Sequence, residues 1–166
     1  LHGAKGISYY NIISSIVTFD GEKGDLFEST KQLNAELSNL GKTLLHLTSR
    51  AIYHGGAVED PYADAVKTSK ILEDLPEHIS AGLLEDAEGR CYLLVMNRDF
   101  EKPVSASVSF REPQRVYEVD KGDGSQRIFL ENSLTLPVNL APGDGALYRL
   151  QKAEEPAYLV EYVIGA

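Results

Sequence analysis

The stretch Val104-Ser105-Ala106-Ser107-Val108-Ser109-Phe110 decides the fold class, because apolar and polar side chains alternate through it without a break. A period of two is typical of a strand with one face on the core and the other in solvent. We therefore expect the valines, Ala106 and Phe110 to face a core, and the three serines to point outward.

Further β-prone runs lie on both sides of this strand, separated by turn signals at a spacing of roughly 8–12 residues. Pro137 interrupts one of these runs, which indicates an edge strand or a bulge. This arrangement predicts an antiparallel β-sandwich or a Greek-key barrel. The strands we expect are 79–85, 90–96, 104–110, 115–119, 127–130, 134–140 and 146–150, with a turn at 111–113 and an eighth strand over 157–164.

Residues 26–47 predict one helix ahead of these strands. The leucines that share one of its faces are Leu26, Leu33, Leu37, Leu40, Leu44 and Leu47. Asp25 and Glu28 suit a capping box at its start, and we expect Gly41 to end or break it.

Residues 6–13 form a different kind of β-prone run, because they show no alternation. Such runs suit a strand that is covered on both faces, as in a parallel sheet. We therefore divide the chain into a strand–loop–helix unit (1–54), a connector (55–77) and an antiparallel β-sandwich domain (78–166). The predicted fold class is mainly β with an N-terminal helical segment.

The composition argues against several classes of partner. The 166 residues carry a net charge of −9, from 25 acidic and 16 basic side chains, which argues against nucleic acid and anionic membranes. Cys91 is the one cysteine, so an internal disulfide and a cysteine-rich zinc site are excluded. The four histidines lack the spacing of metal ligands, and we expect no metal and no cofactor.

The sequence contains no signal-peptide pattern and no apolar stretch of the roughly 18 residues that a membrane helix needs. We therefore expect a soluble protein, of unknown compartment. Asp99, Asp120 and Asp123 lie in polar or glycine-rich turns, and turn formation explains them better than calcium binding.

We assign no catalytic residue. A Gly-x-Ser-x-Gly elbow is absent, and no carboxylate pair stands out at strand ends, where glycosidases place theirs. Tyr9, Tyr10 and Asn11 are the candidate substrate-binding residues, because aromatic rings and an amide at the end of a buried strand suit a sugar ring and its hydroxyls. The alternative is that one tyrosine packs in a core and Asn11 caps a loop.

The opening Gly3-Ala4-Lys5-Gly6-Ile7-Ser8-Tyr9-Tyr10 resembles the last barrel strand of β-galactosidase-like (β/α)8 glycoside hydrolases. The run Leu33-Asn34-Ala35-Glu36-Leu37-Ser38-Asn39-Leu40-Gly41 is similar to the helix that follows there, and Ala51-Ile52-Tyr53-His54 resembles the exit segment towards a C-terminal domain. Val95-Met96-Asn97-Arg98-Asp99 and Leu140-Ala141-Pro142-Gly143-Asp144-Gly145 resemble a strand end and the closing turn of that domain. The resemblance implies that the catalytic carboxylates follow earlier barrel strands, which this chain does not contain.

We therefore expect a C-terminal fragment of a glycoside hydrolase that is inactive alone, with the sandwich bracing the catalytic barrel. A start at Leu1, inside a structural element and without methionine, favours a preceding portion. The expected partners are the rest of the barrel and a carbohydrate. Residues 3–13 should be mobile or paired with a second copy of the chain, unless they join the sandwich as an extra strand.

Two other functions stay open at this point. An independent carbohydrate- or protein-binding module would carry an exposed aromatic platform, and the absence of tryptophan counts against it. A purely structural interaction domain would bind no ligand at all.

Overall fold

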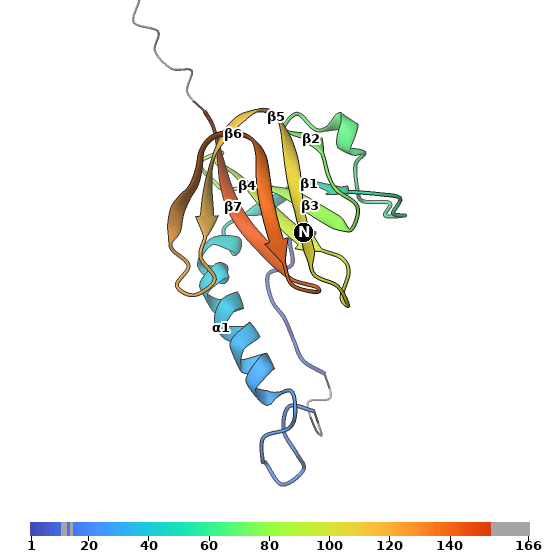
Figure 1. The fold of residues 1–166 in the computed structure, drawn as a ribbon. Coiled ribbons are helices and arrows are strands. Elements are labelled where there is room, and N and C mark those ends of the chain that lie inside the picture. Colours follow the sequence, from blue (N-terminus) through green and yellow to red (C-terminus); the bar gives the residue numbers. More distant parts are fainter. Residues whose placement is uncertain (11–12, 14, 154–166) are drawn as a thin grey trace, which may run out of the picture.

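The computed structural model describes residues 1–10, 13 and 15–153. It confirms a mainly β fold with one N-terminal helix (Figure 1). The elements in chain order are α1 (Phe27–Leu44), β1 (Thr48–His54), the short 3-10 helix η1 (Val66–Thr68), β2 (Leu72–Asp74), β3 (Ile79–Glu85), β4 (Cys91–Asn97), β5 (Val104–Val119), β6 (Gln126–Leu140) and β7 (Gly145–Lys152).

The strands form one antiparallel, curled sheet in the order β1-β3-β4-β7-β5-β2, with β6 paired to β5. β5 connects the two layers of the curl. Its first half pairs with β6 and β2, and its second half pairs with β6 and β7. The register places Val108 opposite Leu136 in the first half and Val116 opposite Leu150 in the second.

The predicted turn at 111–113 is wrong, because β5 runs through it as one strand and β6 likewise joins the expected strands 127–130 and 134–140. The register of β5 against β6 shifts between Ser109 and Gln114, and such irregularities bend a strand without ending it. The backbone stays bonded across the bend, since Arg111 N donates to Ile71 O and Pro113 O accepts from Ala153 N. The strand expected over 157–164 lies outside the described residues.

The main core fills the space between the two layers. Val108 and Phe110 are buried in it, and Val104 and Ala106 pack against it, so the predicted inward face of this strand is confirmed. The other layer contributes apolar side chains from β3, β4 and β7, among them Ile79, Ala81, Leu83, Leu93, Val95, Tyr148 and Leu150.

β1 and β2 both belong to this sheet, although they precede residue 78. Ile52 of β1 lies opposite Gly82 of β3, and Leu72 of β2 lies opposite Phe110 of β5. The sheet therefore begins within the range expected for the strand–loop–helix unit.

α1 differs from its prediction at both ends. No side chain caps its start at Leu26, so the predicted capping role of Asp25 is wrong. Loop carbonyls satisfy the first amides instead, since Ser15 O accepts from Leu26 N and Gly24 O from Phe27 N. Gly41 does not break the helix, which continues to Leu44.

Residues 6–10 do not form the strand expected there, and the described residues before α1 join no strand of the sheet. A strand needs a neighbour to pair with, and these residues have none among the described strands. The alternative, that these residues join the sandwich as an extra strand, is therefore wrong for the described residues. Residues 1–5 lie against the sheet and the end of α1: Leu1 contacts Gly82, and Lys5 Nζ donates to Leu44 O and Leu47 O.

In the part of the chain that the structure describes, no helix combines the length and the apolar character needed to cross a lipid bilayer.

Candidate functional site

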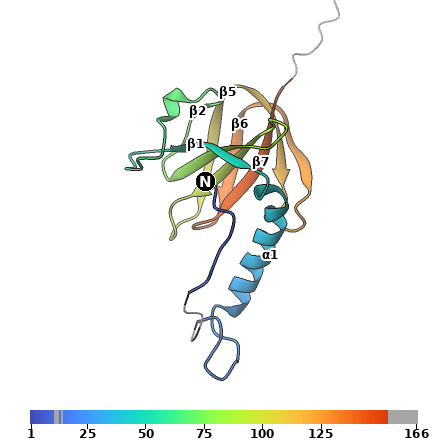
Figure 2. The ribbon, with the colours of Figure 1, turned by 180° about the vertical axis from the view of Figure 1, so that it is seen from behind.

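An arm extends away from the sheet in both views (Figures 1 and 2). It consists of residues 6–38 as far as they are described. The segment before α1 runs down along the helix to a loop at the far end, and α1 then returns to the sheet. Tyr9 ties the two parts of the arm together, because its hydroxyl donates to Asn34 Oδ1 at 2.7 Å.

Large apolar side chains are exposed along this arm. They come from the segment before α1, from the loop and from the helix itself: Ile7, Tyr9, Tyr10, Ile13, Phe19, Leu26 and Leu33. Single exposed apolar residues are normal on a protein surface, but a group of them in one region marks an interaction site. The arm is therefore the strongest candidate for a functional surface.

The exposure of the leucines along α1 shows where the sheet stops covering the helix. The exposed fraction is 47% at Leu33 and 52% at Leu26, just before the helix, but only 7% at Leu40 and 1% at Leu47, three residues beyond its end. Leu40 and Leu47 pack on a second apolar cluster on the outer face of the sheet, formed by Leu84, Tyr92, Val119 and Leu147. The same face of the helix is thus covered over its last turns and open over its first.

The structure places two of the three predicted substrate-binding residues on the arm. Tyr9 is 41% exposed and Tyr10 is 99% exposed, so both rings offer surface to a ligand or a partner. Asn11 lies outside the described residues. Neither tyrosine lines the hollow at residues 103–105 and 139–141, the hollow beside the β5–β6 turn, or the hollow at the end of α1.

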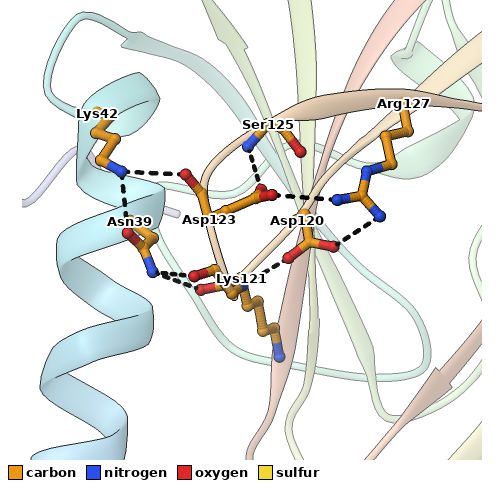
Figure 3. A network of polar contacts seen from close by, with 8 residues as sticks. Asn39, Lys42, Asp120, Lys121, Asp123, Ser125 and Arg127 are labelled. Atoms are coloured by element: carbon orange, nitrogen blue, oxygen red, sulfur yellow. Dashed lines mark hydrogen bonds and ion pairs between the residues drawn. The ribbon is translucent and has the colours of Figure 1, made fainter.

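A network of polar contacts holds the base of the arm to the turn between β5 and β6 (Figure 3). Asn39 Nδ2 donates to Lys121 O at 3.1 Å and to Gly122 O at 2.7 Å. Lys42 Nζ donates to Asp123 O and to Asn39 Oδ1, both at 3.0 Å. Sequence reasoning missed this network, because its partners are backbone carbonyls some 80 residues away along the chain.

The aspartates of the turns cap backbone amides, as predicted. Asp120 Oδ1 accepts from Gly122 N at 2.6 Å, and Asp123 Oδ1 accepts from Ser125 N at 2.7 Å. Asp99 Oδ1 accepts from the amides of Glu101 and Lys102. These carboxylates serve the local backbone, which accounts for their position.

A serine–histidine–aspartate chain lies at the end of β1. His54 Nδ1 lies 2.6 Å from Ser80 Oγ, and His54 Nε2 lies 3.0 Å from Asp60 Oδ2. In hydrolases the serine bonds Nε2 and the aspartate bonds Nδ1, so the two contacts are reversed here. Ser80 is also completely buried, and no substrate could reach its hydroxyl. These contacts of His54 connect β1 to the loop after it and to β3.

Three carboxyl groups have lowered pKa values, which do not suit acid catalysis. The hydrogen bond with His54 and the amide of Tyr62 lower the pKa of Asp60. Backbone amides likewise lower the pKa of Asp99, and the hydroxyl and amide of Ser125 lower that of Asp123. A glycosidase needs a carboxylic acid with a raised pKa to protonate the leaving group. These three groups are therefore poor candidates for that role.

The lone thiol is not activated either. Burial raises the pKa of Cys91 to about 11, so the thiolate is scarce at neutral pH.

The described sheet carries no aromatic platform of the kind that a sugar-binding module would need. Tyr62, Phe100 and Phe129 are exposed, but they come from two loops and from β6, and no ring contact joins them. A hollow of about 380 Å³ lies between the end of α1 and the turn after β3. Its aromatic residue, Tyr92, is buried and offers no open face for stacking.

No protein-family model matches the chain, and no curated protein matches it.

Proposed function

We propose that this chain is a non-catalytic, C-terminal part of a β-galactosidase-like glycoside hydrolase, and that its arm docks against the remainder of a (β/α)8 barrel. The observation that carries the proposal is the leucine face of α1, which the sheet covers at Leu40 and leaves open at Leu33. A barrel helix buries such a face against the barrel strands.

The state of residues 6–10 fits the same proposal. They are rich in β-prone side chains yet form no strand, as expected of a barrel strand whose neighbours are on another part of the protein. Once those neighbours are present, residues 6–10 would pair with them, and Ile7 would become buried. Tyr9 and Tyr10 would then lie at the end of a barrel strand, where they would border a carbohydrate site.

The role of the sheet in this proposal is to brace the barrel. The sheet has its own buried core between its layers, so it needs no partner to complete that core. The chemistry, hydrolysis of a glycosidic bond by two carboxylates, would belong entirely to the barrel.

The direct test starts from the gene. We expect the sequence that encodes Leu1 to follow several hundred codons of alternating strands and helices. The polypeptide encoded upstream, expressed separately, should bind this chain, and binding should be measured by titration calorimetry.

A pair of variants makes the binding test specific to the arm. Leu33→Asp should abolish binding, because it puts a charge on the open leucine face. Leu134→Asp is the matched control: Leu134 is exposed to a similar extent but lies on β6, and this variant should bind normally. A start codon close to Leu1, or an upstream polypeptide that does not bind, would overturn the proposal.

A further inference from the structure

The last turns of α1 pack on an apolar surface of the sheet. This packing does not by itself fix the direction of the helix axis. Leu40 and Leu47 pack on Tyr92, Val119 and their apolar neighbours on the outer face of the sheet. Hydrophobic contact stabilises the helix on the sheet, but it is non-directional. A helix held only in this way could rotate or slide on this surface.

Two side chains of α1 add directional hydrogen bonds to this apolar packing (Figure 3). Asn39 donates to the carbonyls of Lys121 and Gly122, and Lys42 donates to the carbonyl of Asp123. Three consecutive carbonyls of one turn are thus bound by side chains that lie three residues apart on the helix. Hydrogen bonds weaken steeply when they are misaligned, so this arrangement favours a single orientation of α1.

The turn is itself braced, so its carbonyls are held in place. Asp120 N donates to Ser125 O, and Gly124 N donates to Asp120 O, both at 2.8 Å. Arg127 binds the carboxylates of both aspartates from the outside, at 3.7 Å to Asp120 Oδ2 and 3.1 Å to Asp123 Oδ2.

Gly124 lets the helix approach the turn closely. Its φ of +77° lies in the left-handed region, and a Cβ at this position would lie 2.7 Å from Asn39 O. That distance is shorter than any tolerated contact, and the opposing atom belongs to the backbone of α1. Any side chain at this position would therefore force the turn and the helix apart.

These contacts are confined to one end of α1. Among the described residues, the hydrogen bonds that α1 side chains make to the sheet and its turns start from Asn39 and Lys42. The twelve residues 27–38 project beyond them, a length of about 18 Å at 1.5 Å per residue. A small rotation at the base would therefore be amplified at Leu26 and Phe27.

We infer that Asn39, Lys42 and Gly124 form a joint that fixes the direction of the arm relative to the sheet, so that the apolar surface of the arm is presented in one preset orientation. Asn39 and Gly124 are the positioning residues of this joint. The use of the preset orientation for docking a barrel rests on the proposed function, but the joint itself can be tested in the isolated chain.

The test measures the distance from the arm to the sheet by pulsed electron spin resonance. Nitroxide labels are attached at Lys31→Cys on the arm and Ser107→Cys on β5, in a Cys91→Ala background. We expect one narrow distance distribution in this labelled parent, because the joint holds α1 in one orientation. A broad distribution in the parent would overturn the inference.

Two matched pairs of variants then test the positioning residues. Gly124→Ala should shift or broaden the distribution, whereas Gly89→Ala should not: Gly89 has the same φ of +77°, but nothing lies within 4 Å of its Cβ position. Both variants incur the same backbone strain, so a difference between them reports the contact with α1.

The second pair keeps the turn intact and tests the side chain of the helix. Asn39→Asp replaces a donor that faces two carbonyls by a carboxylate oxygen, and it should broaden the distribution. Asn34→Asp is the control, because Asn34 acts as an acceptor from Tyr9 and a carboxylate preserves that role. Equal distributions within both pairs would overturn the inference. Failure of the upstream polypeptide to bind, with these distances as expected, would instead refute the proposed function alone.

Discussion

Leu33 and Leu40 lie two turns apart on one face of α1, yet 47% of Leu33 is exposed and only 7% of Leu40. The sheet covers the helix only near its end, and this contrast gives a direct test of the architecture. Leu40→Ala should destabilise the chain by about 2–5 kcal/mol, the usual cost of removing a buried leucine side chain.

Leu33→Ala should cost clearly less in the isolated chain, because about half of Leu33 is already exposed. Urea unfolding of both variants, followed by circular dichroism, would measure the two changes. Equal losses would mean that the arm is folded back onto other parts of the protein.

The core between the layers predicts a second contrast, within β5. Phe110→Ala should cost about 3–5 kcal/mol, because the ring is buried between the layers. Ser107→Ala should change the free energy of unfolding very little, because Ser107 points outward. If both variants unfolded at the same urea concentration, the face assigned to this strand would be wrong.

The strands of the sheet could be predicted from sequence where the hydrophobic pattern lies within one strand. The alternation of valine and serine from Val104 to Phe110 identifies the inward face of β5, and 79–85 has the bounds of β3. The long β5 was not predictable, because Pro113 and its neighbours are a turn by composition and a strand only through their partners on β2 and β7.

The base of the arm shows the same limit. Gly41 reads as a helix breaker, but the contacts of Asn39 and Lys42 on either side of it help to hold α1 in place. Helix propensity costs about 1 kcal/mol at a glycine, and tertiary contacts of this kind override it. Sequence periodicity could place leucines on one face of α1, but it could not show which of them the sheet would cover.

The hydrogen bonds of Asp60 predict a loss of stability in acid. The bond with His54 and the amide of Tyr62 hold the pKa of Asp60 below its ordinary value. A carboxyl group with a lowered pKa in the folded state contributes stability above its ordinary pKa of about 4, and that contribution is lost as the pH falls through the lowered value.

Asp60→Asn should therefore unfold at lower urea concentration than the parent at pH 6, and the difference should shrink as the pH falls towards 2. Asp20→Asn, at an exposed position of the arm loop, serves as the control. A difference between Asp60→Asn and the parent that stayed constant from pH 6 to pH 2 would contradict the assignment.

The isolated chain should have no glycosidase activity. The acid and the nucleophile of a retaining enzyme, or the acid and the base of an inverting one, act as a pair, and the proposed function places both on the barrel. Aryl glycosides of several sugars should therefore release no chromophore above the uncatalysed rate. Turnover that survives repeated purification, and that a single Asp or Glu substitution in this chain removes, would refute this expectation.

The arm should also determine whether the isolated chain self-associates in solution. Without a barrel, the apolar residues Ile7, Phe19 and Leu33 stay largely exposed to solvent. Residues 6–10 also have backbone groups with no strand beside them, and such segments template pairing with another chain. We therefore expect concentration-dependent self-association through residues 3–13, measurable by sedimentation velocity.

Ile7→Asp should shift this equilibrium to the monomer, because a charge cannot be buried without a partner. Phe100→Asp is the control, since Phe100 is also highly exposed but lies in the loop after β4, and it should leave the mass distribution unchanged. Amide hydrogen exchange provides the opposing outcome. Strong protection of the amides of Ile7 to Tyr10 in a strictly monomeric sample would show that these residues have found partners within the chain. In that case neither self-association nor the open barrel strand of the proposed function could stand.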